Sequence, residues 1–197
     1  MKSFIFCIIG YLLGSISSAI IICKFYQLPD PRSVGSGNPG TTNVMRMGNS
    51  KAAALVLVGD ALKGFIAIML ARFFNVDAFS LSFVALFTVI GHMYPVYFGF
   101  KGGRGVATAF GALLGLSFFV AIFSLVIWQV VFFFTRYSSL AAIFAAAAMP
   151  MLAVLFDDAR YFVGLVLMTA IILFKHRDNI YRLLDGTEPK TELKPRK

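Results

Sequence analysis

Six long apolar blocks constrain this chain more than any other feature of its sequence. They cover residues 3–23, 52–74, 78–100, 105–135, 139–156 and 159–174. Most of them approach the ~20 residues that an α-helix needs to cross the hydrocarbon of a bilayer. Only 14% of the residues are charged, against about 25% in a typical soluble domain. The sequence therefore predicts an all-α, polytopic helix bundle integral to a membrane.

The fourth block is too long for a single span. A continuous helix over residues 105–135 would measure about 45 Å, whereas the hydrocarbon core is about 30 Å thick. We expect two helices that turn near Gly115–Ser117. With the N-terminus outside, this division places most of the 18 Lys and Arg residues on the cytoplasmic side, where basic residues are enriched. The prediction is seven transmembrane helices, N-terminus outside and C-terminus cytoplasmic.

The sequence indicates one domain and a short tail. Residues 1–186 form the predicted transmembrane domain, and residues 187–197 are expected to be a polar, mobile cytoplasmic tail. The first apolar block exceeds the about 7–15 residues of a signal-peptide core, so we expect it to be retained. The net charge of +9 favours anionic lipid or a small phosphorylated substrate. No nucleic acid partner is predicted, because the basic residues are scattered between apolar blocks.

The first predicted inner loop reads GSGNPGTTNVMR from Gly35 to Arg46. It matches G-x-G-x-x-G formally, but no strand precedes it, which excludes a dinucleotide-binding fingerprint. Glycines allow backbone N–H groups to converge on an anion, and an arginine adds a forked cation. The candidate phosphate ligands are Ser36, Gly37, Asn38, Thr42, Asn43 and Arg46. The alternative is a flexible polar connector.

The second inner segment reads HMYPVYFGFKGGRGVAT over residues 92–108. A helix is expected to begin near Gly105, and helix N-termini favour anions. The candidate anion ligands are Lys101, Gly102, Gly103, Arg104 and Gly105. The alternative is a basic membrane anchor beside a helix-packing patch of glycines. His92 by itself is interpreted as a residue that fixes a loop by hydrogen bonding.

The third segment spans residues 174–186. On a helix, His176 and Asn179 share a face, and a histidine can bind phosphate or exchange protons near neutral pH. The alternative is the basic end of a helix at the membrane surface. Ser139 lies on the same predicted side. Asp60 and Lys63, inside the second span, are expected to form an internal ion pair.

The three stretches GSGNPGTTNVMR, GHMYPVYFGFKGGRGVAT and HRDNIYRLLDGTE resemble those of the bacterial acyl-phosphate:glycerol-3-phosphate acyltransferase family, PlsY. The resemblance covers essentially the whole chain. It implies a seven-helix protein of the inner membrane whose active site faces the cytoplasm. The implied reaction transfers a fatty acyl group from acyl phosphate to the 1-hydroxyl of glycerol 3-phosphate. Its products are lysophosphatidic acid and inorganic phosphate, for phospholipid biosynthesis, with no cofactor and no metal.

The resemblance also implies roles for individual residues. The catalytic candidates are Arg46, Arg104, His176 and Asn179. Phosphate would be held by Ser36, Gly37, Asn38, Thr42, Asn43, Gly102, Gly103 and Gly105, and glycerol 3-phosphate by Ser139, His176 and Asn179. The family usually has lysine where this chain has Arg104.

Two points are left open. The resemblance favours the substrate's own phosphate as the general base, with His176 as the second candidate. The alternative function is a membrane transporter of phosphate or an organic anion. Clustering of polar residues at one membrane face and the lack of a visible repeat argue against it.

Overall fold

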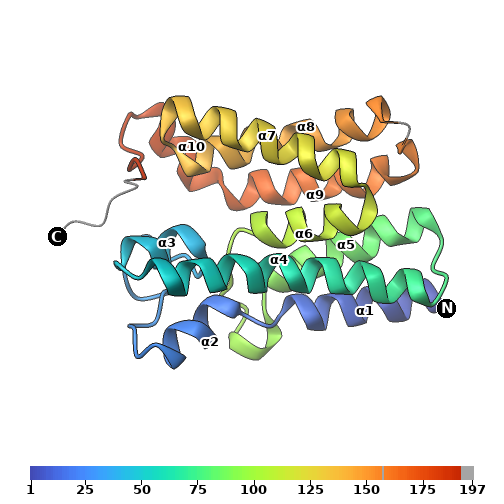
Figure 1. The fold of residues 1–197 in the computed structure, drawn as a ribbon, viewed down its shortest axis with the longest axis horizontal. Coiled ribbons are helices and arrows are strands. Elements are labelled where there is room, and N and C mark those ends of the chain that lie inside the picture. Colours follow the sequence, from blue (N-terminus) through green and yellow to red (C-terminus); the bar gives the residue numbers. More distant parts are fainter. Residues whose placement is uncertain (157, 192–197) are drawn as a thin grey trace.

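The chain forms a helical bundle in the computed structural model, which describes residues 1–156 and 158–191. The described residues contain no β-strand. The helices are α1 (Lys2–Gly14), α2 (Ser18–Phe25), α3 (Thr41–Arg46), α4 (Ser50–Phe73), α5 (Ala78–Met93), η1 (Val96–Phe98), α6 (Val106–Leu116), α7 (Phe118–Thr135), α8 (Ser138–Leu155), η2 (Ala159–Tyr161), α9 (Phe162–Lys175) and α10 (Arg177–Leu184). Figure 1 shows two layers, with α7, α8 and α9 packed on α1, α4, α5 and α6. The all-α prediction is confirmed.

Five stretches in the described part of the chain are long and apolar enough to cross a bilayer. They are Lys2–Phe25, Ser50–Phe73, Ala78–Phe98, Phe118–Thr135 and Ser138–Leu155. A sixth arises if α9 and α10 are counted together despite a bend of 59° between them. The long fourth block divides at Ser117, within the predicted turn. Its first half, α6, has only 11 residues and a length of about 16 Å, less than the hydrocarbon thickness.

Glycines bring the helix backbones of the lower layer into contact. A Cβ on Gly91 of α5 would overlap the carbonyl oxygen of Tyr11 in α1. A Cβ on Gly111 of α6 would likewise overlap the carbonyl oxygen of Ala61 in α4. Membrane helices gain little from apolar burial alone, so this close backbone approach is a main source of packing energy. It fixes α5 against α1 and α6 against α4, and the second motif connects α5 to α6.

A proline in α8 creates a hydrogen-bond defect that α9 repairs. Pro150 has no N–H to donate to the carbonyl of Ala146, four residues earlier. Thr169 Oγ1 in α9 donates to that carbonyl oxygen at 2.7 Å. Backbone polar groups inside a bilayer must find protein partners, so the contact ties α8 to α9.

The first apolar block is interrupted, although the sequence predicts one continuous helix there. Residues 15–17 separate α1 from α2, which exposes the carbonyl oxygen of Ile16. The Lys63 Nζ atom in α4 donates to it at 2.7 Å. The predicted ion pair is confirmed, with Lys63 Nζ 2.9 Å from Asp60 Oδ1. The helix breaks where a buried ammonium supplies the hydrogen bond that the backbone lacks.

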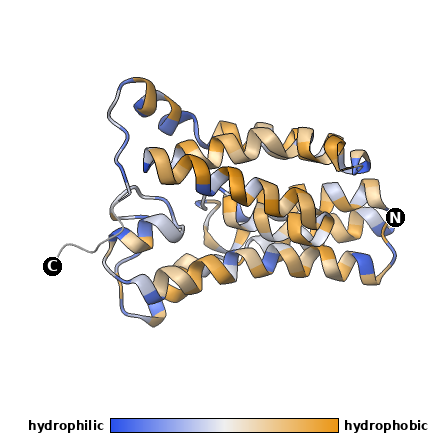
Figure 2. Ribbon diagram, turned by 45° about the horizontal axis from the view of Figure 1, so that its top comes forward, coloured by the Kyte–Doolittle hydropathy of each residue, from blue (hydrophilic) through white to orange (hydrophobic). Residues whose placement is uncertain are grey.

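Polar residues collect at the ends of the bundle. Figure 2 shows hydrophobic residues along the length of the helices and hydrophilic ones in the terminal loops. The outer face of α7 is apolar and open, with Phe118 61% and Phe134 79% exposed, as expected for contact with lipid. The end opposite Met1 carries α3, α10 and the longest loops (Figure 1). The first and third motif segments lie at this end. The second follows α5 and contacts the first loop, where Arg32 donates to the Phe98 carbonyl oxygen at 3.2 Å.

Candidate active site

The first motif forms a loop that a single asparagine holds in shape. Asn43 Nδ2 donates to the carbonyl oxygens of Pro31 at 2.8 Å and Val34 at 3.0 Å. Asn43 Oδ1 accepts from the backbone N–H of Ser36 at 2.9 Å. Both amide hydrogens are therefore used within the loop. Asn43, a predicted phosphate ligand, uses both side-chain donors within the loop and braces it.

The remaining polar groups of the first motif are more open. Gly37 has a φ of +68°, a backbone conformation that glycine adopts without strain. The hydroxyls of Thr42 and Ser138 lie 3.3 Å apart, which brings α3 against the start of α8. Arg46 is exposed, and its guanidinium donates to the carbonyl oxygen of Pro189 at 3.3 Å. The first motif therefore directly contacts the segment that follows α10.

The second motif turns sharply before α6. Gly103 N donates to the carbonyl oxygen of His92 at 3.1 Å, and a Cβ on Gly102 would overlap the same oxygen. Gly105 starts α6 with a φ of +83°. Lys101 is exposed. We call residues 27–46 and 92–105 together the loop wall, because the chain turns here between the long helices, with only the short helices α3 and η1 and the end of α5 included.

Arg104 is the available cation of the loop wall. Its half-buried side chain makes no hydrogen bond or ion pair with any residue in the described part of the chain. Burial lowers the pKa of its guanidinium to about 10, so the charge is kept at neutral pH. Arg46, Arg182 and Glu188 lie close enough to act on it electrostatically. A partly buried arginine without a partner is a strong site for an anion.

The third motif places His176 just after the last residue of α9, with 1% of its surface exposed. Its Nδ1 atom lies 2.8 Å from the carbonyl oxygen of Ile172. A carbonyl oxygen can only accept, so Nδ1 carries the proton and Nε2 presents a lone pair. Burial lowers the pKa of His176 to about 4. The ring is therefore neutral at pH 7 and acts as an acceptor.

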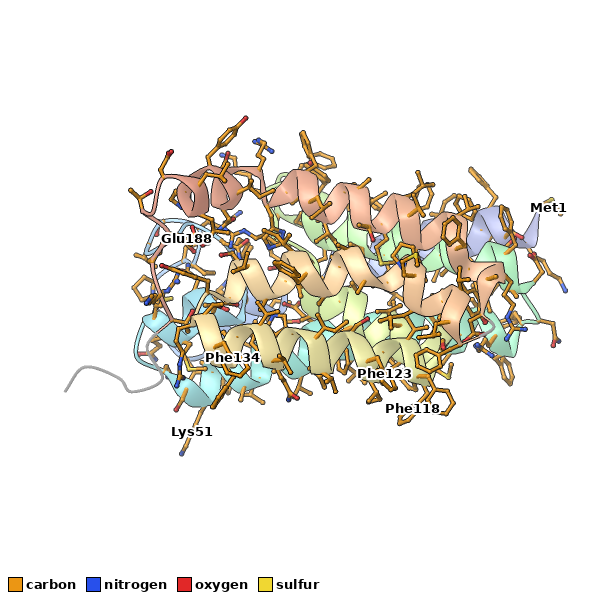
Figure 3. All side chains as sticks on the ribbon, turned by 90° about the horizontal axis from the view of Figure 1, so that it is seen from above. Met1, Lys51, Phe118, Phe123, Phe134 and Glu188 are labelled. Atoms are coloured by element: carbon orange, nitrogen blue, oxygen red, sulfur yellow. The ribbon has the colours of Figure 1, made fainter. Side chains whose placement is uncertain are left out.

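Glu188, a carboxylate for which the sequence predicts no role, contacts both α8 and α10. Glu188 Oε1 accepts from Ser139 Oγ and from Asn179 Nδ2, both at 2.6 Å. Glu188 Oε2 pairs with Arg182 Nε at 2.8 Å. Burial raises the pKa of Glu188, but these three hydrogen bonds outweigh it and leave that pKa below its ordinary value. Figure 3 shows Glu188 at the end of the bundle farthest from Met1.

The start of the predicted tail lies on the bundle. The backbone N–H of Thr191 donates to the carbonyl oxygen of Arg136 at 2.9 Å, at the turn between α7 and α8. The Lys190 ammonium lies 5.6 Å from the centre of the Tyr137 ring. Residues 187–191 therefore connect α10 to α8, and residues 192–197 lie outside the described part of the chain. We call α8, α9, α10 and residues 187–191 the helix wall.

The helix wall carries hydrogen-bond acceptors that have no donor among the described residues. Asn179 is 2% exposed, and its Oδ1 atom is buried without a hydrogen-bond partner among the described residues. Together with Nε2 of His176, it presents lone pairs to the same end of the bundle. Arg104 lies close enough to His176 to affect its pKa. The site therefore combines a cation on the loop wall with acceptors on the helix wall, which suits a ligand bearing both phosphate and hydroxyl groups.

Sequence reasoning brought the right segments together and missed Glu188. Its one signal is position, because this acidic residue falls two places after Gly186 in the third motif stretch. Its partners Ser139 and Arg182 become neighbours only when α8 and α10 pack.

Comparison with known proteins identifies the family. The family model described as glycerol-3-phosphate acyltransferase matches residues 4–186. A protein of that name from Coxiella burnetii (strain CbuG_Q212) is 49% identical over 186 residues, covering 94% of this chain and 96% of the relative. One from Legionella pneumophila (strain Philadelphia 1) is 47% identical over 196 residues, covering 98% and 71%.

Two solved structures have the same fold. A crystal structure of PlsY, an integral membrane glycerol 3-phosphate acyltransferase in its glycerol 3-phosphate form, superposes with a TM-score of 0.91. Its sequence identity is 41%, and the match covers 98% of this chain and 96% of that one. The lysophosphatidic acid form of PlsY gives a TM-score of 0.89 at 40% identity, covering 96% and 95%. These matches span nearly the whole bundle and all three motif segments, so the chain belongs to the glycerol-3-phosphate acyltransferase family.

Proposed function

We propose that this protein transfers a fatty acyl group from acyl phosphate to the 1-hydroxyl of glycerol 3-phosphate, giving lysophosphatidic acid and inorganic phosphate. The observation that carries the proposal is the half-buried Arg104, which has no hydrogen bond or ion pair among the described residues and lies close to His176. His176 Nε2 and Asn179 Oδ1 add acceptor atoms on the helix wall. Both substrates bear phosphate, and one bears the hydroxyl that must react. Family membership favours this reaction over the transporter alternative.

The two walls divide the chemistry. Arg104, with Arg46 near the tail, binds phosphate and stabilises the charge on the phosphate that leaves. Ser36, Gly37, Asn38, Thr42, Gly102, Gly103 and Gly105 complete the phosphate cradle, with Lys101 at its exposed edge. His176 Nε2 and Asn179 Oδ1 accept hydrogen bonds from glycerol hydroxyls and orient them, while Ser139 stays fixed by Glu188.

The reaction is a direct displacement at the acyl carbonyl. The 1-hydroxyl oxygen forms the ester bond to the carbonyl carbon, and the bond from that carbon to the phosphate oxygen breaks. The hydroxyl proton passes to a phosphate oxygen of the substrates. His176, with a pKa of about 4, is a weak base and serves mainly to orient the hydroxyl. Rate enhancement comes from positioning and from fixed positive charge.

We further propose seven membrane segments, with the N-terminus outside and the site facing the cytoplasm of the bacterial inner membrane. The pattern of basic residues supports this orientation. In this arrangement α6 enters the membrane from the site end and is too short to cross it. The chain turns at Ser117 and returns to the site end through α7.

An assay of the purified protein tests the reaction. Acyl phosphate and labelled glycerol 3-phosphate are expected to give labelled lysophosphatidic acid and one equivalent of inorganic phosphate. Acyl-CoA and acyl carrier protein donors run in parallel are expected to give none. Product from acyl-CoA and none from acyl phosphate would contradict the proposal. Proteoliposomes loaded without acyl donor serve as the control for transport of labelled phosphate.

Labelling with a membrane-impermeant thiol reagent tests the orientation. Single cysteines placed at Ser36 and Thr187, both exposed, are expected to react only after the membrane is opened, and one at Asn75 to react in intact cells. The native Cys7 and Cys23 are first replaced by alanine. Reaction of the cysteines at 36 and 187 from opposite sides of the membrane is incompatible with one shared pocket.

A further inference from the structure

We propose that His92 is a further substrate-binding residue, whose Nε2–H donates to a phosphate oxygen, and that the buried Lys63 fixes the tautomer that makes this possible. The inference deepens the proposed function, because it rests on a substrate that bears phosphate. It concerns a histidine that the sequence alone assigns to loop support.

The first step is the environment of the Lys63 ammonium. Three acceptor atoms surround its Nζ: the Ile16 carbonyl oxygen at 2.7 Å, Asp60 Oδ1 at 2.9 Å and His92 Nδ1 at 3.0 Å. The contact with Asp60 is an ion pair rather than an aligned hydrogen bond. Lys63 and Asp60 are 7% and 2% exposed, so water does not compete for these contacts.

The second step is the tautomer of His92. An ammonium group has three donors and no acceptor, so the nitrogen that faces it must offer a lone pair. Nδ1 of His92 is that nitrogen, 3.0 Å from Lys63 Nζ. The Asp60 Oδ1 atom also faces Nδ1 but lies 3.6 Å away, beyond hydrogen-bond distance. In a neutral imidazole the proton then resides on Nε2. The buried Lys63 thus makes the other edge of the ring a donor.

The third step is where Nε2 lies. A Cβ added to Gly103 would overlap His92 Nε2 and lie 3.0 Å from the carbonyl oxygen of Pro39. Pro39 belongs to the first motif and Gly103 to the second, so Nε2 is at the junction of the two segments predicted to hold phosphate. No hydrogen bond involves Nε2 in the described part of the chain. The Nε2–H donor of His92 therefore has no partner among the described residues and lies where the two motif segments meet.

A neutral donor at this place complements Arg104. The arginine supplies charge. The neutral imidazole adds a directional hydrogen bond and brings no further positive charge into a basic site. Hydrogen bonds to charged oxygens contribute enough that loss of one costs about 10- to 100-fold in the equilibrium or rate that depends on it.

Two substitutions of His92 separate binding from support of the loop. The amide of His92→Gln extends to the position of Nε2 and can still donate to phosphate. The amide of His92→Asn stays near the position of Nδ1 and can still accept from Lys63, but it does not reach the junction. We expect His92→Asn to lower kcat/KM for glycerol 3-phosphate or acyl phosphate by about 10- to 100-fold, and His92→Gln to retain most of it.

A purely supporting role predicts the opposite order, because His92→Asn keeps the contact to Lys63 and His92→Gln disturbs it. Equal activity of His92→Asn and the unaltered protein would also overturn the proposal. Folding of both variants is checked by thermal unfolding in detergent before kinetics.

The tautomer is measured directly on the unaltered protein by NMR of ¹⁵N-labelled imidazoles. The chain has only 2 histidines, so a His176→Gln sample assigns both. We expect His92 to carry its proton on Nε2, and that resonance to shift when inorganic phosphate is added but not with chloride at matched ionic strength. A proton on Nδ1, or no response to phosphate, would overturn the proposal.

This measurement requires no turnover. If acyl phosphate proves not to be the donor, the proposed function fails while the tautomer and the phosphate response are still observed. If the tautomer is wrong, the assay with acyl phosphate is unaffected. The two failures are therefore distinguishable.

Discussion

The two histidines of this chain stand on different walls of the site and are held in opposite ways. On the loop wall, His92 Nδ1 faces the Lys63 ammonium and must accept. On the helix wall, His176 Nδ1 faces the Ile172 carbonyl oxygen and must donate. The free edge of the ring is consequently a donor in the first case and an acceptor in the second. What lies behind each ring, rather than the residue type, determines what it offers to a ligand.

The two walls also differ in whether backbone or side chains form them. The loop wall is built from backbone, and at Gly102 and Gly103 it has no space for a Cβ atom. The helix wall is built from side chains around a carboxylate, with Ser139 and Asn179 both bound to Glu188. One wall therefore depends on the absence of side chains and the other on their identity.

The largest expected effect tests the cation of the loop wall. We expect Arg104→Ala to lower kcat by about 10²- to 10³-fold, the usual effect of removing a group that stabilises developing charge. Arg104→Lys, which restores the family's usual residue, is the matched control and should retain most activity. Initial rates of phosphate release measure both. Near-normal activity in Arg104→Ala would remove the functional distinction between the walls.

The next effect tests the backbone of the loop wall. Gly102→Ala is expected to lower activity by about 10- to 100-fold, because the new methyl group meets the His92 carbonyl oxygen and a displacement near 1 Å is enough to disturb catalysis. Gly48→Ala is the control: its Cβ meets nothing within 4 Å, and its expected cost is about 1–2 kcal/mol of stability from a positive φ. Similar activity losses in both variants would show that the contact with the His92 carbonyl oxygen is not the cause.

A smaller effect tests the helix wall. Glu188→Ala frees Ser139 and Asn179 from their common partner, and we expect about a tenfold loss of activity. Hydrogen exchange at residues 187–191 should rise in the same variant. Thr187→Ala, at an exposed neighbour, is the control. Unchanged exchange in Glu188→Ala would mean that the carboxylate does not hold this segment.

The pKa of Glu188 adds a pH test of the same contact. Because that pKa is lowered from 4.5 in the folded protein, the contact contributes stability above pH 4.5 and loses it as the pH falls through the lowered value. Protection of residues 187–191 should therefore persist at neutral pH and disappear only in acid.

The smallest expected effect concerns the pH dependence of the rate. With a pKa of about 4, His176 is neutral throughout the neutral range and adds no inflection near pH 6.5 to the rate profile. His176→Gln should lower the rate and leave the shape of the profile unchanged between about pH 6 and 8. Loss of a limb near pH 6.5 in this variant would identify His176 as the general base instead.

Local pattern predicted much of this molecule. Block length against bilayer thickness predicted the helices and the division beside Ser117, because both quantities are fixed by the backbone and the membrane. Glycines, basic residues and the motif order placed the three segments at one end. The ion pair of Asp60 and Lys63 followed from their spacing on one helix.

Features that depend on distant partners escaped sequence analysis. The break at Ile16 requires Lys63, which lies 47 residues away. The sequence does not reveal that the side-chain donors of Asn43, a predicted phosphate ligand, bind the carbonyl oxygens of Pro31 and Val34. Glu188 was read as part of the tail because Ser139, 49 residues earlier, gives no local sign of pairing with it.

The contact between Thr169 and the Ala146 carbonyl has a consequence for how a fatty chain is admitted. A proline within a membrane helix normally creates a point at which the helix can bend. Here the carbonyl that the proline leaves free accepts a hydrogen bond from the adjacent helix. The helix that carries Ser139 and the helix that leads to His176 are consequently coupled at this point. An opening that admits a fatty chain is therefore expected between other helices than α8 and α9.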